Sequence, residues 1–409
     1  MKKNFRKTIQ LGTGTLVAQI ITLVSIPILT RLYNPETYGF LAVLILASSA
    51  ILPIVTLKVE TLIFTLSDEE EVLNLVSPLR DFLFIISLCV SIMVFGILSL
   101  IKNLSVGSSF IYSFYFLVIL VTQSSILLLV QINLHSKEYL NITKSSVYQN
   151  LGISIFQIGF GIFRPSITSL IGGFVTGKIL GILPLWKQAK TKYIITQEKS
   201  SIKLRKVKDI FSKSKKIILG NTLDIAHAFI PTFFIGSMLG AQYSGYTAVV
   251  ATILGVPSTF IGGAIGSVLL AEFSDIKSSE TYTQVKKYLQ PFVALSILYS
   301  ATLLIFGKEL FLFVLGESWK ESANLVKFLA IPFAINIFWQ PMNSIILKSK
   351  DFNLYVALNS SRFILSSMTL PVTYYLGSSW ISIISCFYGA NSLVQLIGIY
   401  RLIRSRKLL

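Results

Sequence analysis

The sequence predicts an all-α integral membrane protein with about twelve transmembrane helices, and two observations carry this prediction. Hydrophobic residues make up 53% of the 409 residues and charged residues only 13%, about half the charged share of a soluble domain. A chain with so little charge could not cover its surface in water, so lipid must solvate it. The second observation is a series of apolar runs, most of them close to the roughly 20 residues that cross a bilayer as a helix.

These runs follow one another along the whole chain, with short polar segments between them. Run 146–163 is short and rich in polar residues, and run 323–347 contains Pro332 and Pro341. The outer stretch GESWKESANLVK, which begins at Gly316, is interpreted as an interfacial helix that Trp319 anchors. The predicted spans are 9–30, 39–66, 82–101, 110–132, 146–163, 166–186, 217–239, 246–271, 288–307, 323–347, 354–376 and 380–400.

The distribution of Lys and Arg predicts the orientation of these spans. With the N-terminus inside, 28 of the 36 Lys and Arg residues fall in inner segments and six in outer loops. Inner loops of membrane proteins are enriched in Lys and Arg. We therefore expect both termini in the cytoplasm. The net charge of +18 is then explained by orientation and by contacts with anionic lipid, and no nucleic-acid partner is expected.

The longest hydrophilic stretch divides the chain into two predicted halves. Segment 187–216 holds eleven Lys and Arg residues and is interpreted as a basic cytoplasmic linker. It separates an N-terminal six-helix bundle, 1–190, from a C-terminal six-helix bundle, 217–409. With six spans in each half, both halves enter the membrane in the same direction, which is typical of transporters with parallel repeats.

A weak internal repeat supports this division. Segment 28–43 can be laid over 234–249 with an offset of 206 residues, which places Gly39 on Gly245. Ala and Val residues also coincide three and four positions later. Both segments join the first helix of a half to its second helix.

Three segments carry a resemblance to a known family. They are LGTGTLVAQIITLVSIPILTRLYNPETYGFLAV from Leu11, MLGAQYSGYTAVVATILGVPSTFIGGAIGSVLLAEFS from Met238, and LGESWKESANLVKFLAIPFAINIFWQPMNSIILKSKD from Leu315. Their order and spacing resemble the oligosaccharide flippases of the multidrug/oligosaccharidyl-lipid/polysaccharide exporter superfamily, which move O-antigen and capsular units. The resemblance implies a MATE-like fold of two bundles around a V-shaped central cavity. The chain departs from the family pattern at Lys58-Val59-Glu60, where relatives often show Arg-Tyr-Glu.

Charged side chains inside the predicted spans are the candidate functional residues. Charges are costly in the membrane and usually mark a site or a pairing partner. At a rise of 1.5 Å per residue, all of them except Glu60 lie roughly 10–12 Å from the inner end of their spans. This shared depth predicts one polar cavity that is open to the cytoplasm. The candidates are Lys58, Glu60, Lys178, Asp224 and Arg362.

The resemblance implies a substrate, a polyprenyl-diphosphate-linked oligosaccharide, that crosses from the cytoplasmic to the outer leaflet. A diphosphate needs cations on the protein, and Lys58, Lys178, Arg362 and Arg31 are the candidate contacts. Asp224 and Glu60 are candidate partners for these cations, and His227, three residues after Asp224, is a candidate for proton coupling. The sugars need polar lining, for which we expect Gln19, Gln157, Asn221, Gln340, Asn343 and Asn359.

The sequence leaves two other functions open, a transporter of another substrate class and an enzyme. A drug/cation antiporter of the same fold would favour an acidic cavity, whereas three buried cations here face two acids. A polysaccharide polymerase is the rival from the enzymes, although no outer loop much exceeds about 15 residues, which is short for one. Two His and two Cys in no ligand spacing predict no metal site, and no cofactor is expected. A flippase would work beside a polymerase and chain-length machinery.

Overall fold

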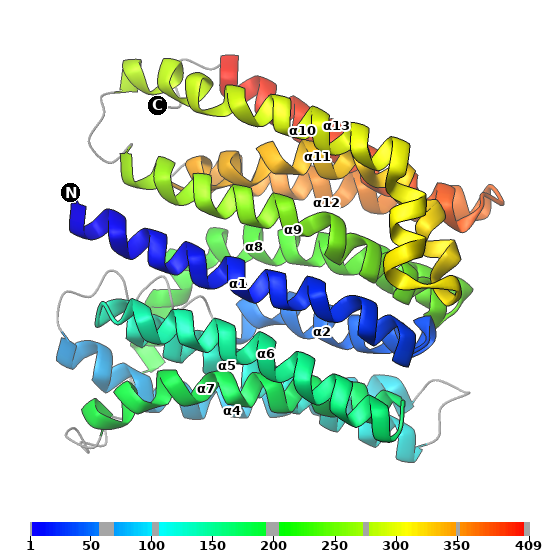
Figure 1. The fold of residues 1–409 in the computed structure, drawn as a ribbon. Coiled ribbons are helices and arrows are strands. Elements are labelled where there is room, and N and C mark those ends of the chain that lie inside the picture. Colours follow the sequence, from blue (N-terminus) through cyan, green and yellow to red (C-terminus); the bar gives the residue numbers. More distant parts are fainter. Residues whose placement is uncertain are drawn as a thin grey trace. The chain divides into compact units, whose positions relative to one another are not determined.

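The computed structural model describes two units of α-helices, without a strand in the part of the chain that it describes (Figure 1). Side chains are described within most of these helices, and the predicted site residues Lys58 and Glu60 lie outside the described residues. The described backbone covers 2–56, 69–99, 106–193, 204–272, 278–348 and 352–404.

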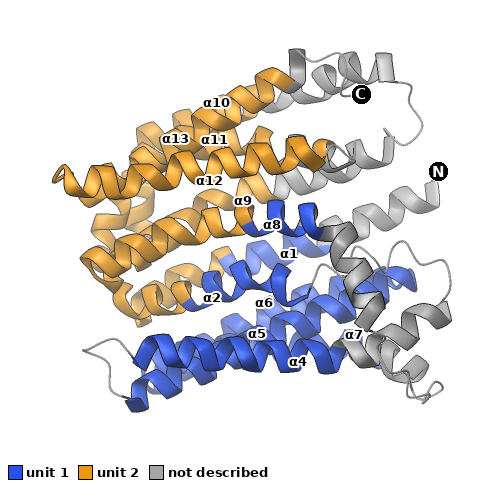
Figure 2. Cartoon of the chain, turned by 180° about the vertical axis from the view of Figure 1, so that it is seen from behind, with its two compact units in different colours: residues 1–22, 44–222 blue, residues 23–43, 223–409 orange. Residues whose placement is uncertain are grey.

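The first unit comprises residues 1–22 and 44–222 (Figure 2). Its helices pack as neighbours in sequence, and the pairs α6–α7 and α4–α5 make extensive contacts. A cluster of buried apolar side chains around Val55, Leu83, Phe116 and Leu120 joins α2, α4 and α5. The helices that lie wholly or partly in this unit are α1 (Lys2–Leu32), α2 (Pro35–Val55), α4 (Glu69–Ser99), α5 (Val106–His135), α6 (Tyr139–Phe163), α7 (Ile167–Tyr193) and, up to residue 222, α8 (Leu204–Leu239).

The second unit comprises residues 23–43 and 223–409 (Figure 2). It therefore includes the end of α1 and the start of α2. Its largest buried cluster contains Trp319, Phe311, Phe387 and many aliphatic residues. This unit also includes α8 from residue 223 onward. The remaining helices are α9 (Ala241–Glu272), α10 (Ser278–Leu315), the short 3-10 turn η1 (Glu317–Trp319), α11 (Lys320–Lys348), α12 (Phe352–Tyr375) and α13 (Trp380–Arg404).

Twelve long helices are present, and nine contain a stretch long and apolar enough to cross a membrane among the described residues. The chain is thus a multi-pass membrane protein. Two of the other three, α6 and α12, have 25 and 24 residues, enough to cross at about 1.5 Å per residue. They fall short in hydropathy because they bury polar side chains such as Gln149, Gln157, Asn359 and Arg362. These polar helices supply the functional groups described below.

Two predicted segments differ from the observed helices. Run 39–66 was expected to form one span, but α2 ends at Val55, before Lys58. The predicted linker 187–216 is helical at both ends, because α7 continues to Tyr193 and α8 begins at Leu204. Its middle lies outside the described residues. Charged residues suit such helix extensions beyond the membrane, where side chains meet water.

The two glycines that the repeat aligned face each other in the second unit. A Cβ atom on Gly39 would lie 1.9 Å from the carbonyl oxygen of Ala241, and one on Gly245 would lie 1.9 Å from that of Pro35. Ala241 is the residue that the same offset assigns to Pro35. The first turns of α2 and α9 thus cross in a reciprocal contact that only glycine permits.

Trp319 lies elsewhere than the sequence indicated. We expected it to anchor an outer helix in the membrane interface, but its side chain is fully buried. Its Nε1 donates a hydrogen bond of 2.9 Å to the carbonyl oxygen of Thr30, and its ring packs edge-on against Tyr38 and Tyr246. A buried indole N–H needs an acceptor, and the end of α1 supplies it.

Candidate functional site

The strongest polar cluster inside the membrane-spanning helices centres on Arg362 of α12. Its Nη1 donates to Asp224 Oδ1 of α8 at 2.6 Å and to Asn359 Oδ1 at 3.1 Å. Its Nε donates to Asn391 Oδ1 of α13 at 3.0 Å, and the ring of Trp339 on α11 lies 4.9 Å from Cζ. Four helices of the second unit therefore hold one guanidinium group.

This arrangement follows from the cost of burying a charge. A guanidinium away from water needs a counter-charge and acceptors for its donors. The carboxylate of Asp224 supplies the charge, and the amides supply two further acceptors in the planar geometry that Arg requires. Tyr355, on the same helix as Arg362, is also buried.

The two partners of the ion pair differ in exposure. The side chain of Arg362 is 6% exposed, whereas that of Asp224 is 31% exposed. The hydrogen bonds of Arg362 to described residues use Nε and Nη1, which leaves the donors of Nη2 for a further acceptor. An anion that approaches from the open side of Asp224 can thus compete for the guanidinium.

His227 lies one helical turn after Asp224 and is buried. Its ring stacks on Phe387 with 4.7 Å between centroids. Its Nε2 has no hydrogen-bond partner among the described residues, and the same holds for the buried Nδ2 of Asn359 and Nε1 of Trp339. The structure therefore places His227 near the cluster through its helix, with no bond to Asp224 among the described contacts.

Lys178 of α7 lies in the first unit and has a different environment. Its Nζ donates to Gln149 Oε1 of α6 at 3.1 Å and lies 5.5 Å from the centroid of Phe174. Gln149 in turn donates to Ser145 Oγ, which donates to the carbonyl oxygen of Gly181. The partners of this lysine in the described part of the chain are thus neutral.

Glycines bring α6 and α7 close enough for these contacts. A Cβ atom on Gly177 would lie 2.1 Å from the backbone nitrogen of Ile153, and one on Gly181 would lie 2.0 Å from Cγ of Gln149. Small residues allow helix backbones to approach in a membrane. Lys178 and Gln149 are therefore held in register by the packing of the two helices.

Arg31 is separate from both of these clusters. It is exposed at the end of α1, where Nη1 donates to the carbonyl oxygens of Pro27 and Val314 and Nη2 to that of Phe313. These contacts cap the end of α10, where unpaired carbonyl oxygens favour a cation. Three of its five N–H donors are used in these hydrogen bonds, so Arg31 stabilises the end of α10 in this conformation.

Sequence reasoning missed several members of these clusters. Asn391, Gln149 and Trp339 were not among the candidates, although each is a polar or amphipathic side chain within an apolar run. Of the expected cavity-lining amides, Asn359 contacts Arg362 and Gln157 donates to the carbonyl oxygen of Leu170. No group of His, Cys, Asp or Glu among the described residues could hold a metal ion.

Comparisons with known proteins agree with this architecture. A family profile described as polysaccharide biosynthesis protein matches residues 28–324. The chain is similar to the lipid II flippase MurJ in an inward closed conformation, with a TM-score of 0.73 and 13% identity over 96% of this chain and 86% of that chain. A comparison with curated protein sequences finds no match.

Two further solved structures share the fold. The MATE transporter VcmN of Vibrio cholerae has a TM-score of 0.64 and 11% identity, over 100% of this chain and 98% of that chain. A MOP superfamily transporter from Pyrococcus furiosus has a TM-score of 0.58 and 12% identity, over 98% of this chain and 96% of that chain. At such low identities the likeness concerns the fold alone, and it confirms the predicted MATE-like all-α class.

Proposed function

Because the chain belongs to the polysaccharide biosynthesis protein family, we propose that it is a flippase for polyprenyl-diphosphate-linked oligosaccharide units. It moves O-antigen or capsular repeat units from the cytoplasmic to the outer leaflet of a bacterial plasma membrane. A polysaccharide polymerase and chain-length machinery then use the product. The protein itself makes and breaks no covalent bond in this reaction.

The observation that carries the proposal is the environment of Arg362. A diphosphate that enters hydrocarbon needs donors that replace water, and an arginine is suited to phosphate because of its planar set of donors. The hydrogen bonds of Arg362 to described residues leave Nη2 without a partner among them, and its counter-ion Asp224 is partly exposed. The diphosphate displaces Asp224 from the guanidinium, and Asp224 returns when the substrate leaves. The empty protein thus avoids an unpaired buried charge.

Lys178 is the second proposed contact, on the first unit. Its partners are an amide and a ring, so no described carboxylate has to be displaced when a phosphate binds. Lys58 completes the proposed set, with Glu60 as its nearest acid in sequence, and both lie outside the described residues. Arg31 is left out because its donors serve the end of α10.

Deletion of the gene tests this function against its rivals. The proposal predicts that surface polysaccharide is lost and that lipid-linked single units accumulate in the inner leaflet. Unpolymerised units in the outer leaflet would show a polymerase instead. Normal polysaccharide together with increased sensitivity to cationic drugs would show a drug antiporter. A plasmid copy of the gene must restore the polysaccharide as the control.

Reporter fusions test the proposed topology. The charge distribution predicts that reporters after Lys216 and at Leu409 lie in the cytoplasm. A fusion in the loop near Arg164, between α6 and α7, is the matched control and must read as outside. A periplasmic signal at Lys216 or Leu409 would contradict the orientation.

A further inference from the structure

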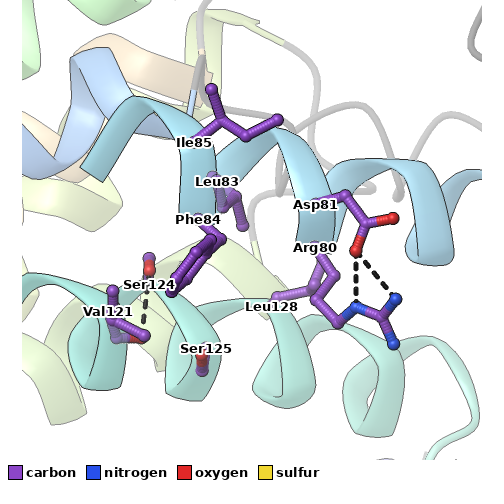
Figure 3. Close-up of a pocket in the computed structure, with 9 residues that line it drawn as sticks. All are labelled: Arg80, Asp81, Leu83, Phe84, Ile85, Val121, Ser124, Ser125 and Leu128. Atoms are coloured by element: carbon purple, nitrogen blue, oxygen red, sulfur yellow. Dashed lines mark hydrogen bonds and ion pairs between the residues drawn. The ribbon is translucent and has the colours of Figure 1, made fainter. Parts of the chain in front are cut away.

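A groove on the first unit lies between the beginning of the apolar part of α4 and the facing part of α5 (Figure 3). It has a volume of about 560 Å³. It is open on one side, so a molecule from the bilayer can enter it laterally. The groove is lined by Arg80, Asp81, Leu83, Phe84, Ile85, Val121, Ser124, Ser125 and Leu128.

The body of the groove is apolar. Leu83 is buried and belongs to the apolar cluster that joins α2, α4 and α5, while the ring of Phe84 is exposed and points towards α5 (Figure 3). Ser124 donates to the carbonyl oxygen of Val121 in its own helix, so its hydroxyl proton is already used. The groove therefore suits a hydrocarbon chain.

One end of the groove is charged. Arg80 donates through Nε and Nη2 to Asp81 Oδ1 at 2.9 and 2.7 Å, and the two side chains are 59% and 61% exposed. Figure 3 shows this pair at the end of the groove near Leu128. The span predicted from the sequence, 82–101, begins directly after this pair, which places the pair near the boundary of the membrane, where lipid headgroups lie.

We propose that this groove binds a zwitterionic phospholipid whose headgroup carries a primary ammonium. The lipid phosphate accepts hydrogen bonds from Arg80, the ammonium donates to Asp81, and one acyl chain lies along Leu83, Phe84 and Leu128. Exposed ion pairs between neighbouring side chains contribute little stability, so both groups are available to a ligand. This site is independent of the transported substrate.

The charge pattern selects this class of lipid over others. An anionic lipid or a polyprenyl diphosphate would bring its negative charge close to Asp81 as well as to Arg80. A phosphatidylcholine headgroup matches the two charges, but its methylated ammonium has no N–H to donate. A primary ammonium supplies both the charge and the hydrogen bond. On the predicted topology, the site faces the cytoplasmic leaflet.

Native mass spectrometry of the full-length protein tests this proposal. The protein is released from micelles that contain equal amounts of phosphatidylethanolamine, phosphatidylcholine and phosphatidylglycerol, and the retained lipids are counted. We expect phosphatidylethanolamine to be retained about threefold over phosphatidylcholine, the size expected of one exposed charged contact. Asp81→Asn removes this preference, and Ser125→Trp, which fills the groove, lowers retention of all three lipids.

A matched control is available on α10, where Glu309 follows Lys308 in the same order of charges. Glu309→Gln must leave the lipid preference unchanged. Equal retention of phosphatidylethanolamine and phosphatidylcholine by the unaltered protein would overturn the proposal. A preference for phosphatidylglycerol that Arg80→Gln removes and Asp81→Asn strengthens would also overturn it, because the site would then be an anion site.

Discussion

Each of the two units holds a candidate cation within a membrane-spanning helix, Lys178 in the first and Arg362 in the second, but they stabilise it in different ways. Arg362 of the second unit is held by a carboxylate and two amides from three helices. Lys178 of the first unit is held by one amide and one ring on two closely packed helices. The charge of Arg362 is thus compensated within the protein, whereas the described contacts of Lys178 supply only dipoles.

This difference predicts how much stability is lost when a residue of each site is replaced. Removal of either partner in the Arg362 cluster leaves a buried charge alone, which is costly. Removal of Lys178 leaves behind a neutral glutamine that keeps its bond to Ser145. We therefore expect large and coupled effects of substitution in the second unit, and small and independent effects in the first.

The largest expected effect is on transport by Arg362→Ala. Loss of hydrogen bonds to a charged group costs about 1.5–3 kcal/mol, so we expect transport of lipid-linked units to fall about tenfold or more. The assay is recovery of surface polysaccharide in a deletion strain, corrected for the amount of protein in the membrane. Arg164→Ala, in an exposed loop, is the control and must transport normally.

The next effect concerns stability in the same cluster. Asp224→Ala leaves Arg362 without its counter-charge, and we expect a loss of about 2 kcal/mol, below the value for a fully buried pair because Asp224 is partly exposed. Asp224→Ala together with Arg362→Ala must lose less than the sum of the single losses. Thermal denaturation in detergent measures both quantities. Simple additivity would show that the pair does not stabilise the protein.

A substitution that disturbs the packing of α6 and α7 in the first unit is expected to lower stability by a similar or smaller amount than Asp224→Ala. Gly177→Ala introduces a Cβ atom that would meet the backbone of Ile153, and overpacking of this kind costs about 1–3 kcal/mol. Gly159→Ala, on α6, meets nothing within 4 Å and is the matched control. If both variants denature at the same temperature, close helix packing does not hold Lys178 in place.

The smallest expected effect is on stability in Lys178→Gln. The change removes one hydrogen bond to a neutral amide, so we expect a loss below about 1 kcal/mol. Transport must fall less than in Arg362→Ala, because Arg362 still contacts the diphosphate. A loss of stability as large as that of Asp224→Ala would remove the contrast between the two units.

The fold class could be predicted from the sequence because it depends on composition and on the length of apolar runs. The depth that Lys178, Asp224 and Arg362 share in their predicted spans follows from helical rise and stays a prediction. Their neighbours could not be predicted. Whether Asp224 faces Arg362 or Lys178 depends on how the helices pack, and an amide such as Asn391 is recognised as a partner only once its helix is placed.

The surroundings of single residues could not be predicted from the sequence either. Trp319 was expected at the lipid interface because aromatic residues are common there, yet the end of α1 offers an acceptor that buries it. Arg31 was expected to contact substrate because cations bind phosphate. Its described hydrogen bonds go to carbonyl oxygens of its own helix and of the end of α10, and its contact with substrate stays a prediction. In both cases a contact distant in sequence decides the environment.

The central claim is that the guanidinium of Arg362 contacts the substrate diphosphate and that Asp224 holds it in the empty protein. The most direct measurement compares translocation of a fluorescent lipid-linked oligosaccharide in proteoliposomes by the unaltered protein and by the Asp224→Ala, Arg362→Ala double variant. We expect the double variant to reconstitute in the same amount and with similar thermal stability as the unaltered protein. Its rate of translocation is expected to be lower by about tenfold or more. Transport at the unaltered rate by this variant would contradict the account.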